Sequence, residues 1–180
     1  MLNVKMSREN EYCVLPSKRE NDGGIDLYID PIWFMDNAYY EGLMIIPPLH
    51  TKMLPTGIRM IVPNTHLLLI QERGSTGIKG MKYSAGVIDS NFRGVINILI
   101  TNCNDCPILL YDPSIFNEDE VLNSVKSFGW KDGIPYPINK GIAQGLFIEV
   151  PKLDIEEVDS NFIKNDKTDR GEGKLGSTGK

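Results

Sequence analysis

The sequence has few of the residues that build disulfide frameworks and nucleic-acid surfaces. It contains three cysteines in 180 residues, and a small, odd number fits a reducing compartment better than a disulfide framework. Acidic residues outnumber basic ones, 24 to 19, and the net charge is -5. This balance argues against a protein that coats nucleic acid, because binding to the phosphate backbone needs clustered Lys and Arg.

Long apolar runs are missing as well. No stretch approaches the roughly 20 apolar residues of a membrane-spanning helix, and residues 1–5 lack the apolar segment of a signal peptide. We therefore expect a cytoplasmic protein, located in the host cytoplasm if the chain is viral, without membrane or nucleic-acid partners. A small anionic ligand is compatible with an acidic protein, since a few placed arginines can hold it.

Short β-prone runs separated by Gly, Pro, Asn and Asp dominate the chain, which is typical of a sandwich, jelly roll or barrel. The run Val95–Ile100 has no polar residue except Asn97, so we expect it to be buried on both faces. The predicted strands cover Leu2–Met6, Ile25–Ile29, Leu43–Ile46, Gly57–Val62, Thr65–Gln71, Gly86–Ile88, Val95–Thr101 and Ile142–Val150.

One segment departs from the β pattern. Asn117 is a suitable N-cap, acidic residues follow it, and the apolar residues up to Phe128 share one face, which predicts a short helix. This helix lies inside an insertion of about residues 104–139. After a polar linker the chain ends in a Gly-rich tail that cannot contribute much to a core. We expect a β domain over residues 1–163 and a flexible arm over residues 164–180.

Several familiar patterns carry little weight. Gly171-x-Gly173-x-x-Gly176 has the spacing of a dinucleotide-binding loop, but that loop needs a strand before it and a helix after it. Cys103-x-x-Cys106 lacks the second Cys or His pair of a zinc site. The histidines are interpreted as surface turn residues.

Five stretches in a fixed order carry the functional signal. They are Gly24–Tyr28, Arg73–Thr76, Ala85–Gly94, Gly141–Gln144 and Arg170–Gly179. The ordered set resembles the five motifs of the trimeric, all-β dUTP pyrophosphatases (dUTPases), here of a phage type with an insertion between the third and fourth motifs. The resemblance implies an all-β fold, a distorted jelly-roll or β-clip barrel with a short helix in the insertion and a flexible C-terminal arm.

The resemblance also implies a reaction. The enzyme would hydrolyse dUTP to dUMP and pyrophosphate with Mg²⁺, as part of nucleotide metabolism and dUMP biosynthesis. Asp89 would be the general base that activates water against the α-phosphate, whereas in isolation it would be interpreted as a turn-capping residue. Asp26 would anchor Mg²⁺ through water, because this ion keeps waters and binds substrate phosphates.

The implied substrate contacts divide between base and phosphates. Backbone groups of the Tyr83–Phe92 hairpin would read the uracil edge, because a fixed order of donors and acceptors leaves polar groups unpaired with another base. Arginines and turn amides would bind the phosphates. The implied substrate-binding residues are Arg73, Gly74, Ser75, Thr76, Tyr83, Gly86, Val87, Ile88, Phe92, Asn97, Gln144, Arg170, Leu175, Gly176, Ser177 and Thr178.

The sequence departs from the family pattern at several of these positions. Tyr83 stands where Asn is usual, Phe92 where Tyr is usual, Gly74 where Ser is usual, and Leu175 where Phe is usual. Asn139-Lys140-Gly141 replaces the usual Gly-Asp-Arg. We expect the contacts at these positions to differ from those usual in the family.

The family pattern implies a homotrimer with shared sites, in which motifs one, two and four come from one subunit, motif three from a second and the tail from the third. A related dCTP deaminase would need Glu where this chain has Leu99. A regulatory or repressor-binding protein that uses residues 104–139 is the other alternative. Without a partner, that segment would be a surface excursion.

Overall fold

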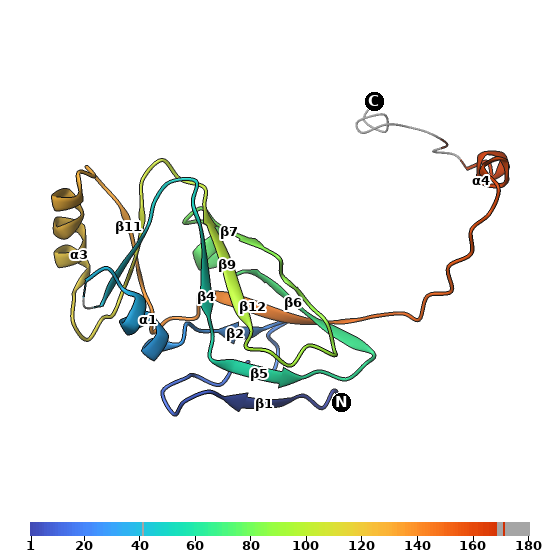
Figure 1. The fold of residues 1–180 in the computed structure, drawn as a ribbon, viewed down its shortest axis with the longest axis horizontal. Helices are drawn as coiled ribbons and strands as arrows, with labels where there is room; N and C mark the ends of the chain where they lie inside the picture. Colours follow the sequence, from blue (N-terminus) through green and yellow to red (C-terminus); the bar gives the residue numbers. More distant parts are fainter. Residues whose placement is uncertain (41, 169–170, 172–180) are drawn as a thin grey trace. The chain divides into compact units, whose positions relative to one another are not determined.

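The computed structural model describes residues 1–40, 42–168 and 171, and its ribbon consists mainly of strands with a few short helices (Figure 1). Contacts divide the chain into two units, Met1–Val150 and Pro151–Lys180. The second unit begins at Pro151, which is upstream of residue 164, where the sequence predicts the start of the flexible arm. No helix in the described residues is long and apolar enough to cross a membrane. The prediction of an all-β fold is confirmed.

Twelve strands form four sheets among the described residues. Their order is β1-β5, β11-β10-β3, β2-β12-β6-β8 and β4-β9-β7. The strands are β1 (Lys5–Arg8), β2 (Ile25–Leu27), β3 (Leu43–Ile46), β4 (Thr51–Pro55), β5 (Ile58–Ile61), β6 (His66–Glu72), β7 (Met81–Ser84), β8 (Val87–Ile88), β9 (Asn97–Asn102), β10 (Ile108–Tyr111), β11 (Ile134–Pro137) and β12 (Ala143–Glu149).

All eight predicted strands overlap observed ones, whereas the sequence pattern does not predict β4, β7, β10 and β11. β7 and β4 carry polar residues that hide the apolar alternation. β11 contains two prolines, which argue against a central strand. The two prolines are tolerated because β11 pairs with β10 on one side only and lies at the edge of its sheet.

The helices are α1 (Pro31–Asn37), α2 (Gly74–Gly77), α3 (Glu118–Ser124), the 3-10 helix η1 (Val125–Phe128) and α4 (Ser160–Asn165). The helix predicted after Asn117 is confirmed. The Asn117 side chain accepts the N–H of Glu120, and the Glu120 carboxylate accepts the N–H of Asn117, which satisfies two helix-end donors at once.

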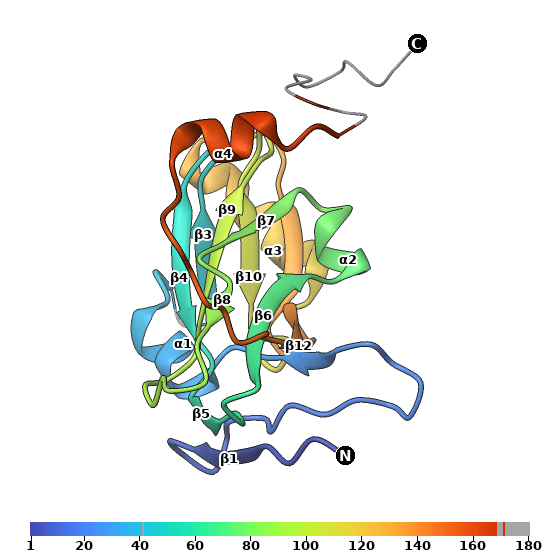
Figure 2. The ribbon, with the colours of Figure 1, turned by 90° about the vertical axis from the view of Figure 1, so that its right-hand side faces the viewer.

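The longest ladder joins β6 and β12 and determines where the motif loops lie. It runs from His66 opposite Glu149 to Glu72 opposite Ala143, and β2 pairs with the other edge of β12. The loop after β6 and the turn before β12 therefore meet at one end of this sheet. Figure 2 shows β6 beside β12, with α2 following β6.

The burial predicted for Val95–Ile100 is wrong for the single chain. In β9, Ile98 and Ile100 are fully buried, but Asn97 and Leu99 on the other face are only partly buried. The sheet β4-β9-β7 covers the core with one face, and antiparallel sheets commonly leave the other face open.

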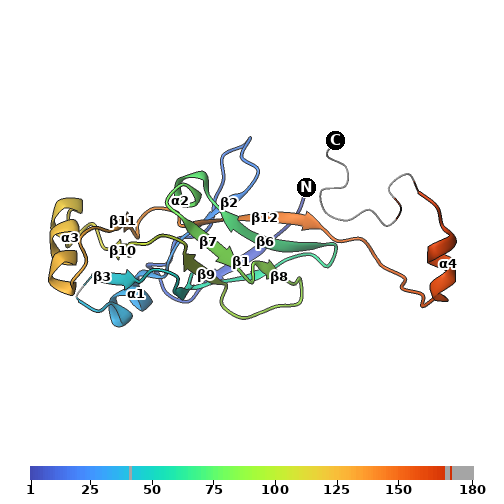
Figure 3. The same ribbon diagram turned by 90° about the horizontal axis from the view of Figure 1, so that it is seen from above.

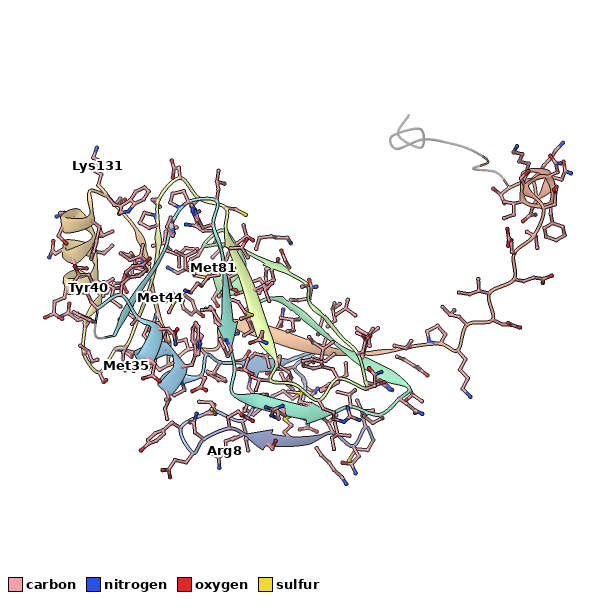
Figure 4. The ribbon with its side chains drawn as sticks, viewed as in Figure 1. Arg8, Met35, Tyr40, Met44, Met81 and Lys131 are labelled. Carbon is pink, nitrogen blue, oxygen red and sulfur yellow. The ribbon has the colours of Figure 1, made fainter. Side chains whose placement is uncertain are left out.

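The strand that is buried on both faces is β10, inside the predicted insertion. Ile108 and Leu110 belong to the main apolar cluster, whereas Leu109 and Tyr111 face a second cluster with Val121 and Val125 of the helical segment. Figure 4 shows Tyr40 beside α3, and its ring packs edge-on against Phe128 with centroids 5.1 Å apart. The insertion is thus part of the core, and its interpretation as a surface excursion is wrong.

The second unit has exposed apolar side chains of its own. Asp159 caps α4 by accepting the N–H of Asn161 at 2.9 Å. Phe162 and Ile163 on this short helix are 70% and 68% exposed, so α4 has no buried face among the residues of its unit that the structure describes.

Leu109→Ala is expected to lower the free energy of unfolding by about 2–5 kcal/mol, because it leaves a cavity at a fully buried position. Urea denaturation at constant protein concentration measures the change. Ile78→Ala is the control, since Ile78 is 89% exposed and its truncation should change stability by less than about 0.5 kcal/mol. Equal stabilities of the two variants would contradict a core role for the insertion.

Candidate functional site

Three of the five predicted motifs meet around the guanidinium group of Arg73. Its Nε lies 2.8 Å from Oδ1 of Asp26, and its Nη2 donates to Oδ2 at 2.9 Å. Its Nη1 donates to the carbonyl oxygen of Gly141 at 2.6 Å. Burial opposes the charge, but the attraction of Asp26 and the nearby Tyr136 hydroxyl raise the pKa of Arg73 above its ordinary value, so the group is a fixed cation.

The turn after Arg73 presents part of its backbone to solvent. Thr76 is buried, and its hydroxyl accepts the N–H of Arg73 at 3.1 Å. Gly74 and Ser75 are exposed at the start of α2, where the first N–H groups have no partner within the helix. The Thr76 side chain therefore stabilises the turn, while the exposed pair can face an anion.

Gln144 lies on β12 between Asp26 on β2 and Gln71 on β6. Its Nε2 donates to the carbonyl oxygen of Glu72 at 2.5 Å. This bond fixes the side chain beside the Arg73 loop and leaves Oε1 and one N–H for other partners.

Two tyrosine hydroxyls fix the turn that precedes β12. Tyr83 donates to the carbonyl oxygen of Ile142, and Tyr136 donates to that of Gly141 at 2.6 Å. Burial, above all, raises the pKa of Tyr83 far above its ordinary value, so this hydroxyl stays protonated and donates. The sequence assigns Tyr83 to the base-reading hairpin, and here its hydroxyl contacts the chain's own backbone. Tyr136 is not among the residues predicted from sequence, because no sequence pattern marks its hydroxyl as a partner of the Gly141 carbonyl group.

The hairpin that contains Gly86 is held against β6 on one side only. The N–H of Ile70 donates to the carbonyl oxygen of Gly86 at 2.8 Å, and β8 is the edge strand of its sheet. Val87 is 59% exposed on this edge. The outer backbone groups of β8 therefore have no strand partner in the described residues and are available to a ligand.

The other hairpin residues lie near the surface. Phe92 is 41% exposed and its ring covers Gly94, so it is not a core ring. The side chain of Asn97 donates to the carbonyl oxygen of Val95 at 3.1 Å and lies on the open face of β9.

Asp89 is exposed and lines a pocket of about 340 Å³ together with Asn64, His66, Leu67, Ser90, Asn91 and Val150. From sequence His66 is interpreted as a turn residue, and its place in this pocket follows only from the pairing of β6 with β8. The carbonyl oxygen of Asp89 accepts the N–H of Phe92 at 3.0 Å, which closes the turn behind the carboxylate.

Asp89 and Arg73 do not meet in the single chain. Asp89 lies beside Leu67 at the start of β6, because Ile88 pairs with Leu68, whereas Arg73 follows the end of the same strand. At about 3.3 Å per residue, the six residues from Leu67 to Arg73 separate the two positions by about 20 Å. Figure 3 shows α2 beyond one end of β6, whereas β8 lies beside the middle of that strand.

The residues predicted in the tail, namely Arg170, Leu175, Gly176, Ser177 and Thr178, lie outside the described residues. Within the described ones, no group of three or more His, Cys, Asp or Glu side chains could hold a metal ion.

Comparisons with known proteins agree with the motif pattern. A family model described as dUTPase matches residues 38–112. A deoxyuridine 5'-triphosphate nucleotidohydrolase of camelpox virus (strain CMS) is 29% identical over 179 residues, which cover 98% of this chain and 92% of the relative.

Solved structures of phage proteins share the fold. The Staphylococcus bacteriophage 80alpha dUTPase, solved with dUPNHPP, matches with a TM-score of 0.67 at 16% identity over 99% of each chain. A mutant of the dUTPase from phage phi11 of S. aureus, whose structure concerns a structural Mg(II) ion, matches with a TM-score of 0.59 at 15% identity over 87% of this chain and 97% of that one. These similarities confirm a jelly-roll-like fold.

Gly86→Ala is expected to lower the free energy of unfolding by about 1–3 kcal/mol, because the hairpin must move and lose its bond to Ile70. The added Cβ would lie 2.5 Å from the carbonyl oxygen of Ile70. Urea denaturation measures the loss. Gly74→Ala is the matched control, since nothing lies within 4 Å of its Cβ. If both variants lose the same stability, the crowding at Gly86 is not its cause.

Proposed function

We propose that this chain acts as a member of the dUTPase family and hydrolyses dUTP to dUMP and pyrophosphate. The main support is the cluster of Asp26, Arg73 and Gly141 beside the exposed Gly74–Ser75 turn. It combines a fixed cation with free backbone donors, as a triphosphate requires.

Arg73 and Gln144 would bind the phosphates. Three of the five N–H donors of Arg73 are used by Asp26 and Gly141, so two on the η nitrogens are left for phosphate oxygens. Gln144 would contact the α-phosphate through its free amide atoms. The tail would close over the bound substrate, with Arg170 on the γ-phosphate, Ser177 and Thr178 as donors, and Leu175 over the base.

Asp89 would take a proton from the water that attacks the α-phosphate. Its exposed carboxylate and its pocket leave room for water and substrate, and a general base typically contributes about 10²–10⁴-fold to the rate. The free edge of β8 would read the uracil edge. Phe92, which is exposed, would lie under the deoxyribose and crowd out a 2′-hydroxyl.

Mg²⁺ would act on the triphosphate rather than inside a protein cage, since it keeps waters and binds substrate phosphates. Asp26 fits an outer role, because its side chain is 35% exposed and each oxygen accepts one bond from Arg73. Further lone pairs remain to accept water protons. When bound, the ion neutralises the triphosphate charge and orients it.

We also propose a homotrimer with three shared sites. The separation of about 20 Å along β6 supports this assembly. Asp89 and Arg73 of one chain lie too far apart to act on the same triphosphate. A second subunit would supply Asp89 to the Arg73 cluster of the first, and the tail would come from the third. Closed ring symmetry makes the three sites equivalent.

Regulation through a protein partner of residues 104–139 is the alternative function. In its support, α3 turns exposed Glu118 and Asp119 outward while its apolar face packs inward. A test of this function has to alter that outer face, because deletion of the segment would remove β10 from the core. A deaminase is not supported, since Leu99 stands where that reaction needs Glu.

Pyrophosphate release in the presence of Mg²⁺ tests the proposed function. We expect dUTP to be turned over at least about 10²-fold faster, as kcat/KM, than dCTP, dTTP and UTP, because a base-reading site built to pair polar groups rejects other bases strongly. Chelation of Mg²⁺ is expected to lower the rate. Equal or absent turnover of all four nucleotides would rule out a dUTP-specific hydrolase.

A mixing experiment tests the shared site. Asp89→Asn and Arg73→Ala are each expected to lose about 10²-fold or more of the dUTP turnover. After equimolar mixing and refolding, about a quarter of the sites in random trimers would receive both intact residues from different subunits. Activity should therefore rise to about a quarter of the wild-type value.

Each variant refolded alone is the control and should stay inactive. If the site lay within one chain, no mixed trimer would contain both residues in one site, and mixing would restore nothing.

A further inference from the structure

The second tyrosine at the turn before β12 connects the insertion to the phosphate cluster. Tyr136 lies on β11 and is 3% exposed. Its hydroxyl donates to the carbonyl oxygen of Gly141, which also accepts Nη1 of Arg73, and both distances are 2.6 Å. A carbonyl oxygen has two lone pairs, so these two donors saturate it. Gly141 is thereby fixed between the insertion and the guanidinium group.

We propose that Tyr136 is a positioning residue for Arg73, so that the segment of residues 104–139 forms part of the phosphate site. The inference rests on the proposed role of Arg73 in binding the triphosphate. Tyr136 itself touches no reacting atom: its hydroxyl bonds the Gly141 carbonyl group and lies near the guanidinium group of Arg73.

The orientation of the guanidinium plane depends on that carbonyl group. A planar guanidinium held by two bonds to Asp26 can still swing with that carboxylate, and the third bond to Gly141 fixes its plane. The two N–H donors that remain free point in directions set by this plane. Their direction decides whether they reach phosphate oxygens, because a bidentate contact depends on geometry.

Tyr136 supplies the side-chain hydrogen bond from the insertion to the Gly141 carbonyl group, and the N–H of Ile142 in the same peptide plane donates to Leu27. The next residue, Ile142, is already held twice, since its N–H donates to Leu27 and its carbonyl oxygen accepts the Tyr83 hydroxyl. The space at Gly141 is also narrow, because an added Cβ would lie 3.1 Å from Cβ of Asp26 and 3.4 Å from Cζ of Arg73. A shift of the Gly141 carbonyl is therefore transmitted directly to the ion pair.

The insertion keeps the Tyr136 ring in place. β11 pairs with β10 in parallel, with Tyr136 opposite Leu110, and Tyr136 and Leu110 both belong to the main apolar cluster. The helical segment covers the other face of β10. The packing of the insertion thus determines where the hydroxyl lies.

Tyr136→Phe removes only the hydroxyl and is the direct test. We expect the KM for dUTP to rise about tenfold, because one hydrogen bond to the phosphate-binding cluster is lost. The value of kcat should stay within about twofold, since Tyr136 bonds the Gly141 carbonyl group and not the general base, which a second subunit would supply. Tyr111→Phe is the matched control, because Tyr111 belongs to the same sheet, is 6% exposed, and has a hydroxyl without a side-chain hydrogen bond in the described residues; its KM should equal the wild-type value.

A double-mutant cycle decides whether Tyr136 acts through Arg73. The affinity for inorganic tripolyphosphate, measured by calorimetry, should fall about tenfold for Tyr136→Phe in the wild-type background and by less than about twofold in the Arg73→Ala background. Equal losses in both backgrounds, or an unchanged affinity in both, would overturn the inference. So would a KM rise that Tyr111→Phe reproduces or that accompanies an equal fall in kcat and thermal stability.

Failure of the proposed function gives a different result. In that case the wild-type protein turns over no nucleotide, while the binding cycle with tripolyphosphate still reports whether Tyr136 positions Arg73. If the wild-type protein hydrolyses dUTP and the cycle shows no coupling, only the role of Tyr136 is rejected.

Discussion

The candidate site depends on the partly buried ion pair between Arg73 and Asp26. Desolvation makes such a pair costly unless its geometry is good, and loss of one partner leaves an uncompensated charge. Here the pair is bidentate and the guanidinium has a third acceptor at Gly141. The adjacency of β2, β12 and β6 makes this geometry possible, because it brings three loops to one end of one sheet. The remaining N–H groups of Arg73 can then be directed outward at an anion.

The same sheet that assembles the cation separates it from the carboxylate of Asp89. β6 is long enough that its two ends cannot serve one small substrate within one chain, and β9 leaves a partly apolar face open on the neighbouring sheet. Both features are explained if subunits associate. In such an assembly, residues of another subunit would lie beside the exposed Asp89. A neighbouring subunit would also cover the open face of β9.

Sequence patterns predict the local features of this protein well and the long-range ones poorly. The cap at Asn117 and the eight strand runs depend on neighbouring residues, and the structure contains them. The ordered motifs also anticipate that Asp26 and Arg73 belong to one site. The Tyr83 hydroxyl bonds Ile142 across 59 residues of the sequence, and the Tyr136 hydroxyl bonds Gly141 through the turn between β11 and β12. No periodicity encodes such pairs. Burial of a strand on both faces also depends on which elements cover it. The apolar run Val95–Ile100 therefore predicts burial on both faces, although one face of β9 is only partly buried.

The covering of β10 also changes how the insertion is understood. Its four residues, Ile108–Tyr111, are buried on both faces because the helical segment lies over the face opposite the main core. A helix that lay only on the surface would not need to pack on a buried strand of the same insertion. Since β10 in turn aligns β11, the side chain that reaches the Gly141 turn is placed by the inserted segment itself. Changes on the outer surface of α3 can therefore leave the site intact, whereas changes in its inner packing act on the phosphate cluster through β10 and β11.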